Sequence, residues 1–343
     1  MIQSINIHLN ERERLILKAT IEDYIETMHP IGSNYLKTCH HFTFSPATIR
    51  NTLAQLEQKG LLTHPHTSSG RIPTDSGYRY FVDELLDKSN INVDECRAIE
   101  QSLVQVADNV DELMQAAASM LAQVSRMFGV VMIRHYQESI LKDIELVALS
   151  SERVMMVLAM KSGLIRSITL NLKVRVNHKM LESVTVILKE RLLDLSLKEI
   201  QQTINERLRD TEIYEHEVVQ ILINDPIHHF SNTQNSIIYQ STLIPLLEQP
   251  EFQDVGILQK TIIALDSQRM MEYLSEQIGD ERNSIFIGNE NENINLDHCS
   301  LISSRFNSND LMGQLVILGP TRISYQNILM ILKQFTEIMT DVC

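Results

Sequence analysis

Apolar residues in the first sixty positions follow the three-to-four residue spacing of amphipathic helices. Asn10 predicts the N-cap of a first helix, and Pro30 predicts its end near residue 28. A short second helix is expected over 33–39, with Ser33 as its N-cap.

The third predicted helix has the clearest signals. Ser45 is the expected N-cap, Pro46 occupies the first helical position, and Gly60 marks the end. A buried stripe is predicted for Ile49, Leu53 and Leu56. The opposite face and its flanks carry small, hydroxyl, amide and guanidinium side chains: Ala47, Thr48, Arg50, Asn51, Gln55 and Gln58. Arginine pairs with guanine, and asparagine or glutamine with adenine, through two hydrogen bonds each.

Two short extended segments follow, 61–64 and 71–74, around a turn at 67–70. Three helices and a β-hairpin predict a winged helix-turn-helix, whose hairpin offers hydroxyls, backbone amides and a cation for phosphate or minor-groove contact. A winged fold that makes only protein contacts stays open on the pattern alone. The candidate DNA-binding residues are Ser45, Ala47, Thr48, Arg50, Asn51, Gln55, Gln58, His66, Thr67, Ser68, Ser69 and Arg71.

Beyond residue 90 the pattern changes to a mixture of helices and strands. Apolar positions over 99–127 alternate steps of four and three, which fits a dimerising coiled coil or a helix on a sheet. Ala107, Met114 and Leu121 widen the stripe and favour packing on a sheet. An antiparallel meander is predicted at 141–149, 153–160 and 165–172, and helices over 176–210 and 213–223. Late strands at 284–287, 301–305 and 314–318 precede a last helix over 325–339.

This order indicates an α+β multidomain chain. A sheet, a helical block and a second set of strands suggest one α+β domain interrupted by an insertion. The expected boundaries are 1–90 for the winged domain, 91–174 with 256–343 for the interrupted domain, and 175–255 for the insertion.

Net charge modifies this reading. The chain carries −14 overall, but residues 1–82 hold 8 basic against 7 acidic residues. Five basic residues lie within 37–79: Lys37, Arg50, Lys59, Arg71 and Arg79. Phosphate binding needs a local positive face and not a basic protein, so the acidic remainder does not exclude DNA binding.

Other compositional features exclude several classes. The four cysteines are far apart without a C-x-x-C pair, which argues against zinc or a disulfide framework and fits a cytoplasmic protein. The longest apolar run, 154–160, is too short to span a bilayer, and no signal peptide is expected. Glycine-rich phosphate loops, G-x-S-x-G and H-E-x-x-H are absent from the sequence, so we expect neither an enzyme nor a cofactor.

Several segments together resemble the HrcA family of heat-inducible transcription repressors. They are YIETMHPIGS (24–33), SPATIRNTLAQLE (45–57), PHTSSGRIPT (65–74), GYRYFVDELL (77–86), IGNEN (287–291) and GPTRISY (319–325). The chain departs from the family pattern at Met28, Pro46, Ser69 and Ile323, none of which removes a polar group assigned to DNA. The resemblance implies a GAF-like domain with an inserted dimerising domain, repression of chaperone operons through an inverted-repeat operator, release on heat shock, and support by the GroE chaperonin.

An inverted repeat also constrains assembly. Each half-site must meet an identical surface, so one winged domain per chain requires a homodimer. We expect the main contact within about residues 175–250, on an apolar face formed by Leu181, Val184, Leu188, Leu192 and Leu193.

Overall fold

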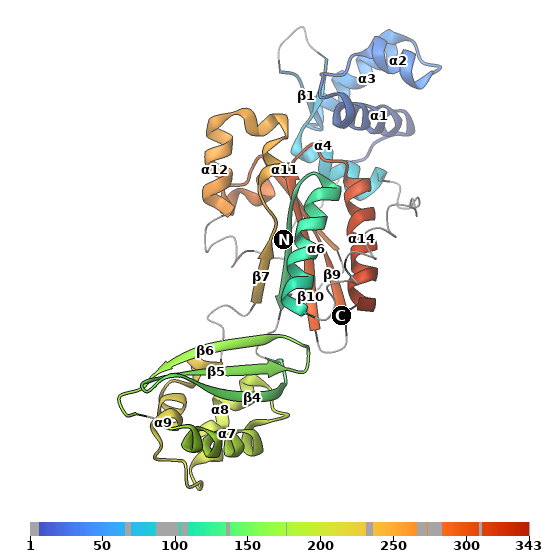
Figure 1. Ribbon diagram of the computed structural model, residues 1–343. Coiled ribbons are helices and arrows are strands. Elements are labelled where there is room, and N and C mark those ends of the chain that lie inside the picture. The colour runs from blue at the N-terminus through green and yellow to red at the C-terminus, as the bar shows by residue number, and fades with distance from the viewer. Residues whose placement is uncertain are drawn as a thin grey trace.

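The protein divides into three lobes arranged along one axis (Figure 1). The computed structural model describes residues 7–65, 70–86, 109–134, 138–175, 177–230, 236–265, 283–308 and 311–342, together with Leu103 and Tyr273. We call residues 7–86 the N-terminal lobe, and the five-stranded sheet with its covering helices the central lobe. The three-stranded sheet and the helices packed on it form the distal lobe.

The N-terminal lobe consists of helices followed by a small hairpin. Its elements are α1 (Glu11–Thr27), α2 (Ser33–His40), α3 (Pro46–Gln58), β1 (Leu62–Thr63), β2 (Ile72–Pro73), α4 (Asp75–Tyr80) and the π-helix η1 (Phe81–Leu85). Strands β1 and β2 pair antiparallel, with Leu62 opposite Pro73. The predicted helices and hairpin strands are therefore confirmed as elements.

Local capping explains where these helices begin and end. Asn10 and Glu13 form a reciprocal capping box at the start of α1, and Met28 ends the helix in the left-handed conformation at φ 58°. The prediction that Ser33 caps α2 is wrong. Gly32 is the N-cap, without a side-chain bond, while Ser33 is the first helical residue and is buried. A cap needs extended backbone, and here Gly32 supplies it.

The central lobe is an antiparallel sheet in the order β7-β3-β10-β9-β8. The strands are β3 (Phe128–Arg134), β7 (Ser236–Gln240), β8 (Asn283–Ile287), β9 (Cys299–Ser308) and β10 (Leu311–Pro320). Helices α6 (Val110–Ser125) and α14 (Tyr325–Val342) pack on one face (Figure 1). The other face packs against α11 (Ile244–Leu247), the 3-10 helix η3 (Pro250–Gln253) and α12 (Val255–Leu265), and the 3-10 helix η4 (Gly288–Ile294) follows β8.

The wide apolar stripe of the predicted helix over 99–127 does pack on a sheet. Leu113, Ala117 and Leu121 of α6 are fully buried, and α6 contacts β3. Apart from Leu103, residues 99–108 lie outside the described residues. Over its described length this helix is thus part of the central core.

The distal lobe holds the predicted meander as a sheet of its own. Strands β4 (Leu141–Ser150), β5 (Arg153–Met160) and β6 (Ile165–Asn171) pair in sequence order. Helices α7 (His178–Leu192), α8 (Leu197–Leu208), α9 (Glu217–Asn224) and α10 (Pro226–Phe230) lie against it (Figure 1).

The structure therefore groups the chain differently from the predicted boundaries of 91–174 and 175–255. The meander joins α7 to α10 and not the late strands, whereas β7, α11 and η3 belong to the central lobe. Alternation along a strand shows that one face is buried, but not which element covers it. Here α7 covers the inner face of the meander, through its contact with β4.

That packing also corrects the predicted dimer face. Leu181, Val184, Leu188 and Leu192 of α7 are 0–4% exposed, because they lie inside the distal lobe. Leu193 caps the helix and packs partly buried against the same core. These side chains hold the lobe together and do not form an external face. Separately, no helix in the described ranges combines the length and apolar character that crossing a membrane requires.

Candidate nucleic-acid interface

Helix α3 is fixed in the N-terminal lobe by its apolar stripe and its N-cap. Ile49, Leu53 and Leu56 are 0–4% exposed, and the helix packs against α1 and α2. Ser45 accepts a hydrogen bond from the Thr48 amide at 3.1 Å, and Pro46 needs no partner for a missing N–H. The opposite side of the helix consequently faces outward.

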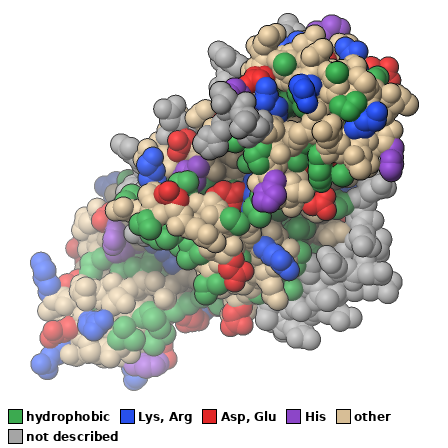
Figure 2. Space-filling view, turned by 90° about the horizontal axis from the view of Figure 1, so that it is seen from above, with side chains coloured by type: hydrophobic (Ala, Val, Ile, Leu, Met, Phe, Trp, Pro, Cys, Tyr) green, Lys and Arg blue, Asp and Glu red, His purple; other side chains and the backbone are tan. Residues whose placement is uncertain are grey.

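This outward side, which we call the α3 face, carries most of the predicted DNA-binding residues. Thr48 is half-buried, with its hydroxyl 2.9 Å from that of Ser45. The exposed members are Ser45, Ala47, Arg50, Asn51, Gln55 and Gln58. Figure 2 looks down onto the N-terminal lobe and shows separate Lys and Arg side chains, most of them among uncharged ones, with some acidic side chains nearby. Short, amide and cationic side chains along one helix can approach base edges closely.

The basic residues of this lobe differ in what they contact. Nζ of Lys59 lies 2.8 Å from a Glu13 carboxylate oxygen, and Arg79 is buried at the junction with the central lobe. Arg50 and Lys37 are exposed, and within the described residues neither side chain has an ion-pair or hydrogen-bond partner. The positive face is therefore smaller than the five basic residues suggested. Arg50 is the residue that contributes to it from α3.

Arg71 is tied to the end of α3. One of its terminal nitrogens lies 2.7 Å from a carboxylate oxygen of Glu57, whose other oxygen contacts His64 Nδ1. Sequence reasoning overlooked Glu57, because an acidic residue next to the buried stripe carries no signal of its partner. The carboxylate fixes both sides of the hairpin to the helix, and it neutralises the cation expected to meet phosphate.

The hairpin itself is anchored through its backbone. Arg71 and Ile31 exchange two N–H···O bonds of 2.9 Å. A Cβ at Gly70 would lie 2.6 Å from the Ile31 backbone, so only glycine allows this approach. The remaining predicted hairpin residues, His66, Thr67, Ser68 and Ser69, lie outside the described residues, and their role stays a prediction.

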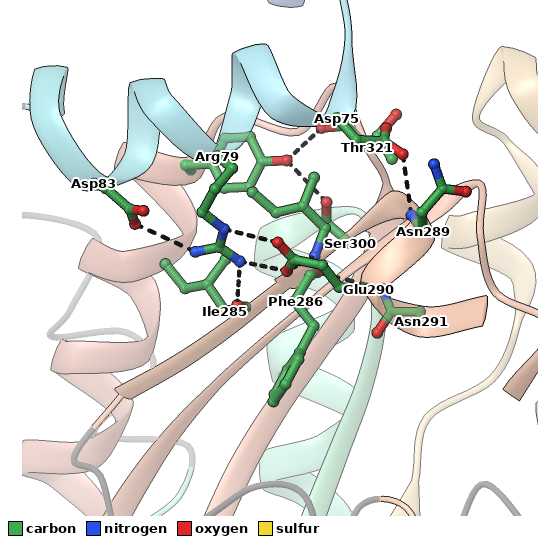
Figure 3. A network of polar contacts seen from close by, with 12 residues as sticks. Asp75, Arg79, Asp83, Ile285, Phe286, Asn289, Glu290, Asn291, Ser300 and Thr321 are labelled. Carbon is green, nitrogen blue, oxygen red and sulfur yellow. Dashed lines mark hydrogen bonds and ion pairs between the residues drawn. The ribbon is translucent and has the colours of Figure 1, made fainter. Parts of the chain in front are cut away.

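A second polar site joins this lobe to the central one (Figure 3). Arg79 on α4 donates from Nε to Glu290 at 2.9 Å and from a terminal nitrogen to the Ile285 carbonyl at 2.6 Å. The backbone amide of Asn289 donates to a carboxylate oxygen of Asp75 at 3.0 Å. A Cβ at Gly288 would lie 2.2 Å from the Asp75 carboxyl group, so this contact also requires glycine. Burial raises the pKa of Asp75, although the hydrogen bond from Asn289 opposes the shift.

Two late segments singled out in the sequence meet at this junction. Asn291 in η4 is fully buried and donates to the carbonyls of Phe286 and Cys299. Tyr325 is buried beside Tyr78, with ring centroids 5.9 Å apart. Arg322 forms an ion pair with Glu251 and contacts the Ile25 carbonyl of α1 at 3.5 Å. The conspicuous late motifs therefore serve to seat the N-terminal lobe.

Known proteins match almost the entire chain. Residues 111–329 match the family model described as the HrcA protein C-terminal domain, which is more than half of the chain. The chain belongs to the HrcA family. The heat-inducible transcription repressor HrcA of Roseiflexus castenholzii is 32% identical over 97% of this chain and 94% of its own length. The heat-inducible transcription repressor HrcA of Halalkalibacterium halodurans is 31% identical over 97% of this chain and 98% of its own length.

HrcA proteins are transcription repressors and not enzymes, so the chain is a transcription regulator of the heat-shock response. One solved structure, described as that of a hypothetical protein, covers 98% of this chain and all of its own, with a TM-score of 0.63 and 19% identity. That likeness supports the mixed α/β fold with antiparallel sheets.

Proposed function

We propose that the N-terminal lobe is a winged helix-turn-helix that binds an inverted-repeat operator of chaperone operons in the cytoplasm. The observation that carries this proposal is the α3 face, where exposed Arg50 stands beside exposed Asn51 on a capped and firmly seated helix. We propose in the same way that the central lobe is the GAF-like domain implied by the family resemblance.

Specific readout would come from the α3 face. Arg50 can donate two hydrogen bonds to guanine O6 and N7, and Asn51 can pair with adenine N6 and N7. The hydroxyls of Ser45 and Thr48 and the backbone amide of Ala47 at the start of α3 suit a phosphate oxygen. The hairpin would lie over the backbone or the minor groove.

The test uses duplexes that the wild-type protein selects from a random library, followed by gel shifts over a range of salt concentrations. We expect an inverted repeat, with binding that weakens linearly in log[salt]. Arg50→Ala and Asn51→Ala should each weaken binding to it by about 1–3 kcal/mol, with little change on random DNA. Lys333→Ala removes an exposed charge on α14 and serves as the control. Selection of no repeat, or wild-type binding by both variants, would contradict this assignment.

A homodimer is part of the proposal, because two half-sites related by a two-fold axis need two identical readers. With the α7 leucines buried, the outer face of the distal sheet is the candidate contact. Val147, Leu149 and Ile165 are 44%, 48% and 63% exposed there, beside half-buried Met155 and Val157 of β5. Burying such side chains against a second copy would remove apolar surface from water.

Single substitutions can locate this contact by light scattering. Val147→Asp should yield monomers, because it places a charge within the apolar face. Val186→Asp is the matched control: Val186 is 63% exposed on α7, on the helical side of the lobe. If the Val186→Asp protein is monomeric while the Val147→Asp protein remains a dimer, the dimer contact lies on the helical side of the distal lobe.

We also propose that heat releases the operator through marginal stability and not through a discrete ligand. The chain has no tryptophan, 5% aromatic residues and 15 methionines, so rigid core anchors are few. Operator and GroE chaperonin would support the folded dimer by mass action, by about 2.7 kcal/mol at one hundred times the dissociation constant. Thermal unfolding with and without the selected duplex tests this: loss of binding by a protein that stays folded and dimeric would refute it.

A further inference from the structure

Helix α3 is linked to the central lobe through α4, with a polar contact at each end of the link. At the C-terminal end of α3, the Gly60 carbonyl accepts a hydrogen bond from the Thr74 hydroxyl at 2.6 Å. Thr74 is the N-cap of α4 and accepts from the Gly77 amide at 3.0 Å. One turn later, Arg79 reaches Glu290 on the central lobe (Figure 3).

Both ends of the Arg79–Glu290 contact are held in place. The Arg79 side chain is 6% exposed, and its nitrogens contact Glu290 through both carboxylate oxygens, the Ile285 carbonyl and Asp83. Glu290 also accepts from the Ile287 amide at 2.8 Å. A two-point contact between planar groups fixes orientation as well as distance. The contact therefore allows little rotation of α4 on the sheet.

We infer that Glu290 is a positioning residue for operator recognition: through Arg79 it fixes the direction of the α3 face relative to the central lobe, and so the half-site spacing that a dimer accepts. This inference rests on the proposed function. In a dimer held together away from the DNA, the two α3 faces reach both half-sites only if the joints between lobes keep one angle. A rigid joint therefore selects spacing, whereas a loose joint tolerates several spacings at lower affinity.

Glu290→Gln weakens the joint with little change in shape, since it removes the charge that pairs with Arg79. The matched control is Glu248→Gln, which makes the same change at an exposed position of the central lobe. Neither residue lies on the α3 face. The probes are the selected inverted repeat, the same repeat with five base pairs inserted at its centre, and a single half-site.

Five inserted base pairs turn one half-site to the opposite side of the duplex, since a helical turn takes about 10.5 base pairs. The wild type and Glu248→Gln should prefer the original repeat by roughly 100-fold, the gain from simultaneous engagement of two sites. Glu290→Gln should lower this preference at least about tenfold, with unchanged affinity for the single half-site.

Retention of the full preference by Glu290→Gln would overturn the inference while leaving operator binding intact. Failure of the wild type to bind any inverted repeat would overturn the proposed function and this inference with it. If circular dichroism shows that Glu290→Gln does not fold, Asp75→Ala takes its place. Asp75→Ala removes the carboxylate that accepts from the backbone amide of Asn289. An unchanged preference of this variant for the original repeat would equally overturn the inference.

Discussion

Two arginines of the N-terminal lobe, Arg50 on α3 and Arg79 on α4, show how differently the same side chain is used. Arg50 is exposed, with no partner within the described residues. Arg79 is 5% exposed and contacts Glu290, Asp83 and the Ile285 carbonyl. In the sequence both are basic residues of a predicted DNA-binding segment. Partners and burial decide that one is available to bind and the other holds two lobes together.

Of the remaining cations in the segment, Lys59 and Arg71 fall between these extremes. Lys59 is half-buried and bridges α3 to α1 through Glu13, and Arg71 is held by Glu57 at the edge of the α3 face. A count of local charge therefore overstates the field available to phosphate. The useful quantity is the number of cations that face solvent without a carboxylate partner.

The largest difference between the two arginines should appear in the free energy of unfolding of their alanine variants. Arg79→Ala leaves Glu290 without its cation at the junction, and we expect it to lower the free energy of unfolding by about 3 kcal/mol. Arg50→Ala removes an exposed side chain and should change the same quantity by less than about 0.5 kcal/mol. Urea denaturation measures both. Equal effects of the two substitutions would remove the distinction between a structural and a binding arginine.

A smaller effect is expected for the bridge from Lys59 to α1, and it depends on pH. Burial raises the pKa of Glu13, but hydrogen bonds from the Lys59 side chain and the backbone amide of Asn10 outweigh this, so the pKa is lowered from its usual 4.5. The stabilisation is therefore complete above pH 4.5 and is lost as the pH falls through the lowered value.

Unfolding free energies at pH 6 and in acid test this sign. Between these conditions the wild type should lose about 1 kcal/mol more than Glu13→Gln, which keeps the capping geometry without the charge. Glu11→Gln, an exposed change in the same helical turn, should behave as the wild type. If acid lowers the free energy of unfolding more in Glu13→Gln than in the wild type, the Glu13 carboxylate does not provide this stabilisation.

The smallest effect concerns the cation held at the edge of the α3 face. Glu57→Gln should remove the carboxylate charge that pairs with Arg71, and the slope of log affinity against log[salt] on random duplex should steepen by about 0.9 for one added phosphate contact. The double variant Glu57→Gln/Arg71→Gln should return to the wild-type slope. If Glu57→Gln leaves the slope unchanged, Arg71 does not reach phosphate even without that carboxylate.

The features that sequence reasoning predicted correctly depend on near neighbours. Ser45 and Pro46 mark the start of α3, and the spacing of its apolar residues identifies the buried side. Even a local signal fails when two adjacent residues can fill one role, as with Gly32 and Ser33. The outward orientation of Arg50 and Asn51 followed directly from helical periodicity.

Contacts between distant parts of the chain could not be predicted in this way. Arg79 and Glu290 are separated by 211 positions, and neither carries a sign of its partner. The segment around Asn289 stood out in the sequence through the family resemblance, and nothing in it predicted the 3-10 helix that receives the N-terminal lobe. Likewise, alternation predicted the strands of the meander but not the lobe that holds them.

The place where the distal lobe leaves the central sheet has a topological consequence. Strands β3 and β7 are antiparallel neighbours, and Arg134 at the end of one lies opposite Ser236 at the start of the other. To the sheet, residues 135–235 are therefore equivalent to the connection of a β-hairpin, whose ends are already brought together by the ladder. Replacing them with a two-residue turn should preserve the strand order, because a hairpin needs no more. The distal lobe is thus an insertion at a single hairpin position of the central sheet, and we expect the same sheet to accept a different lobe in its place.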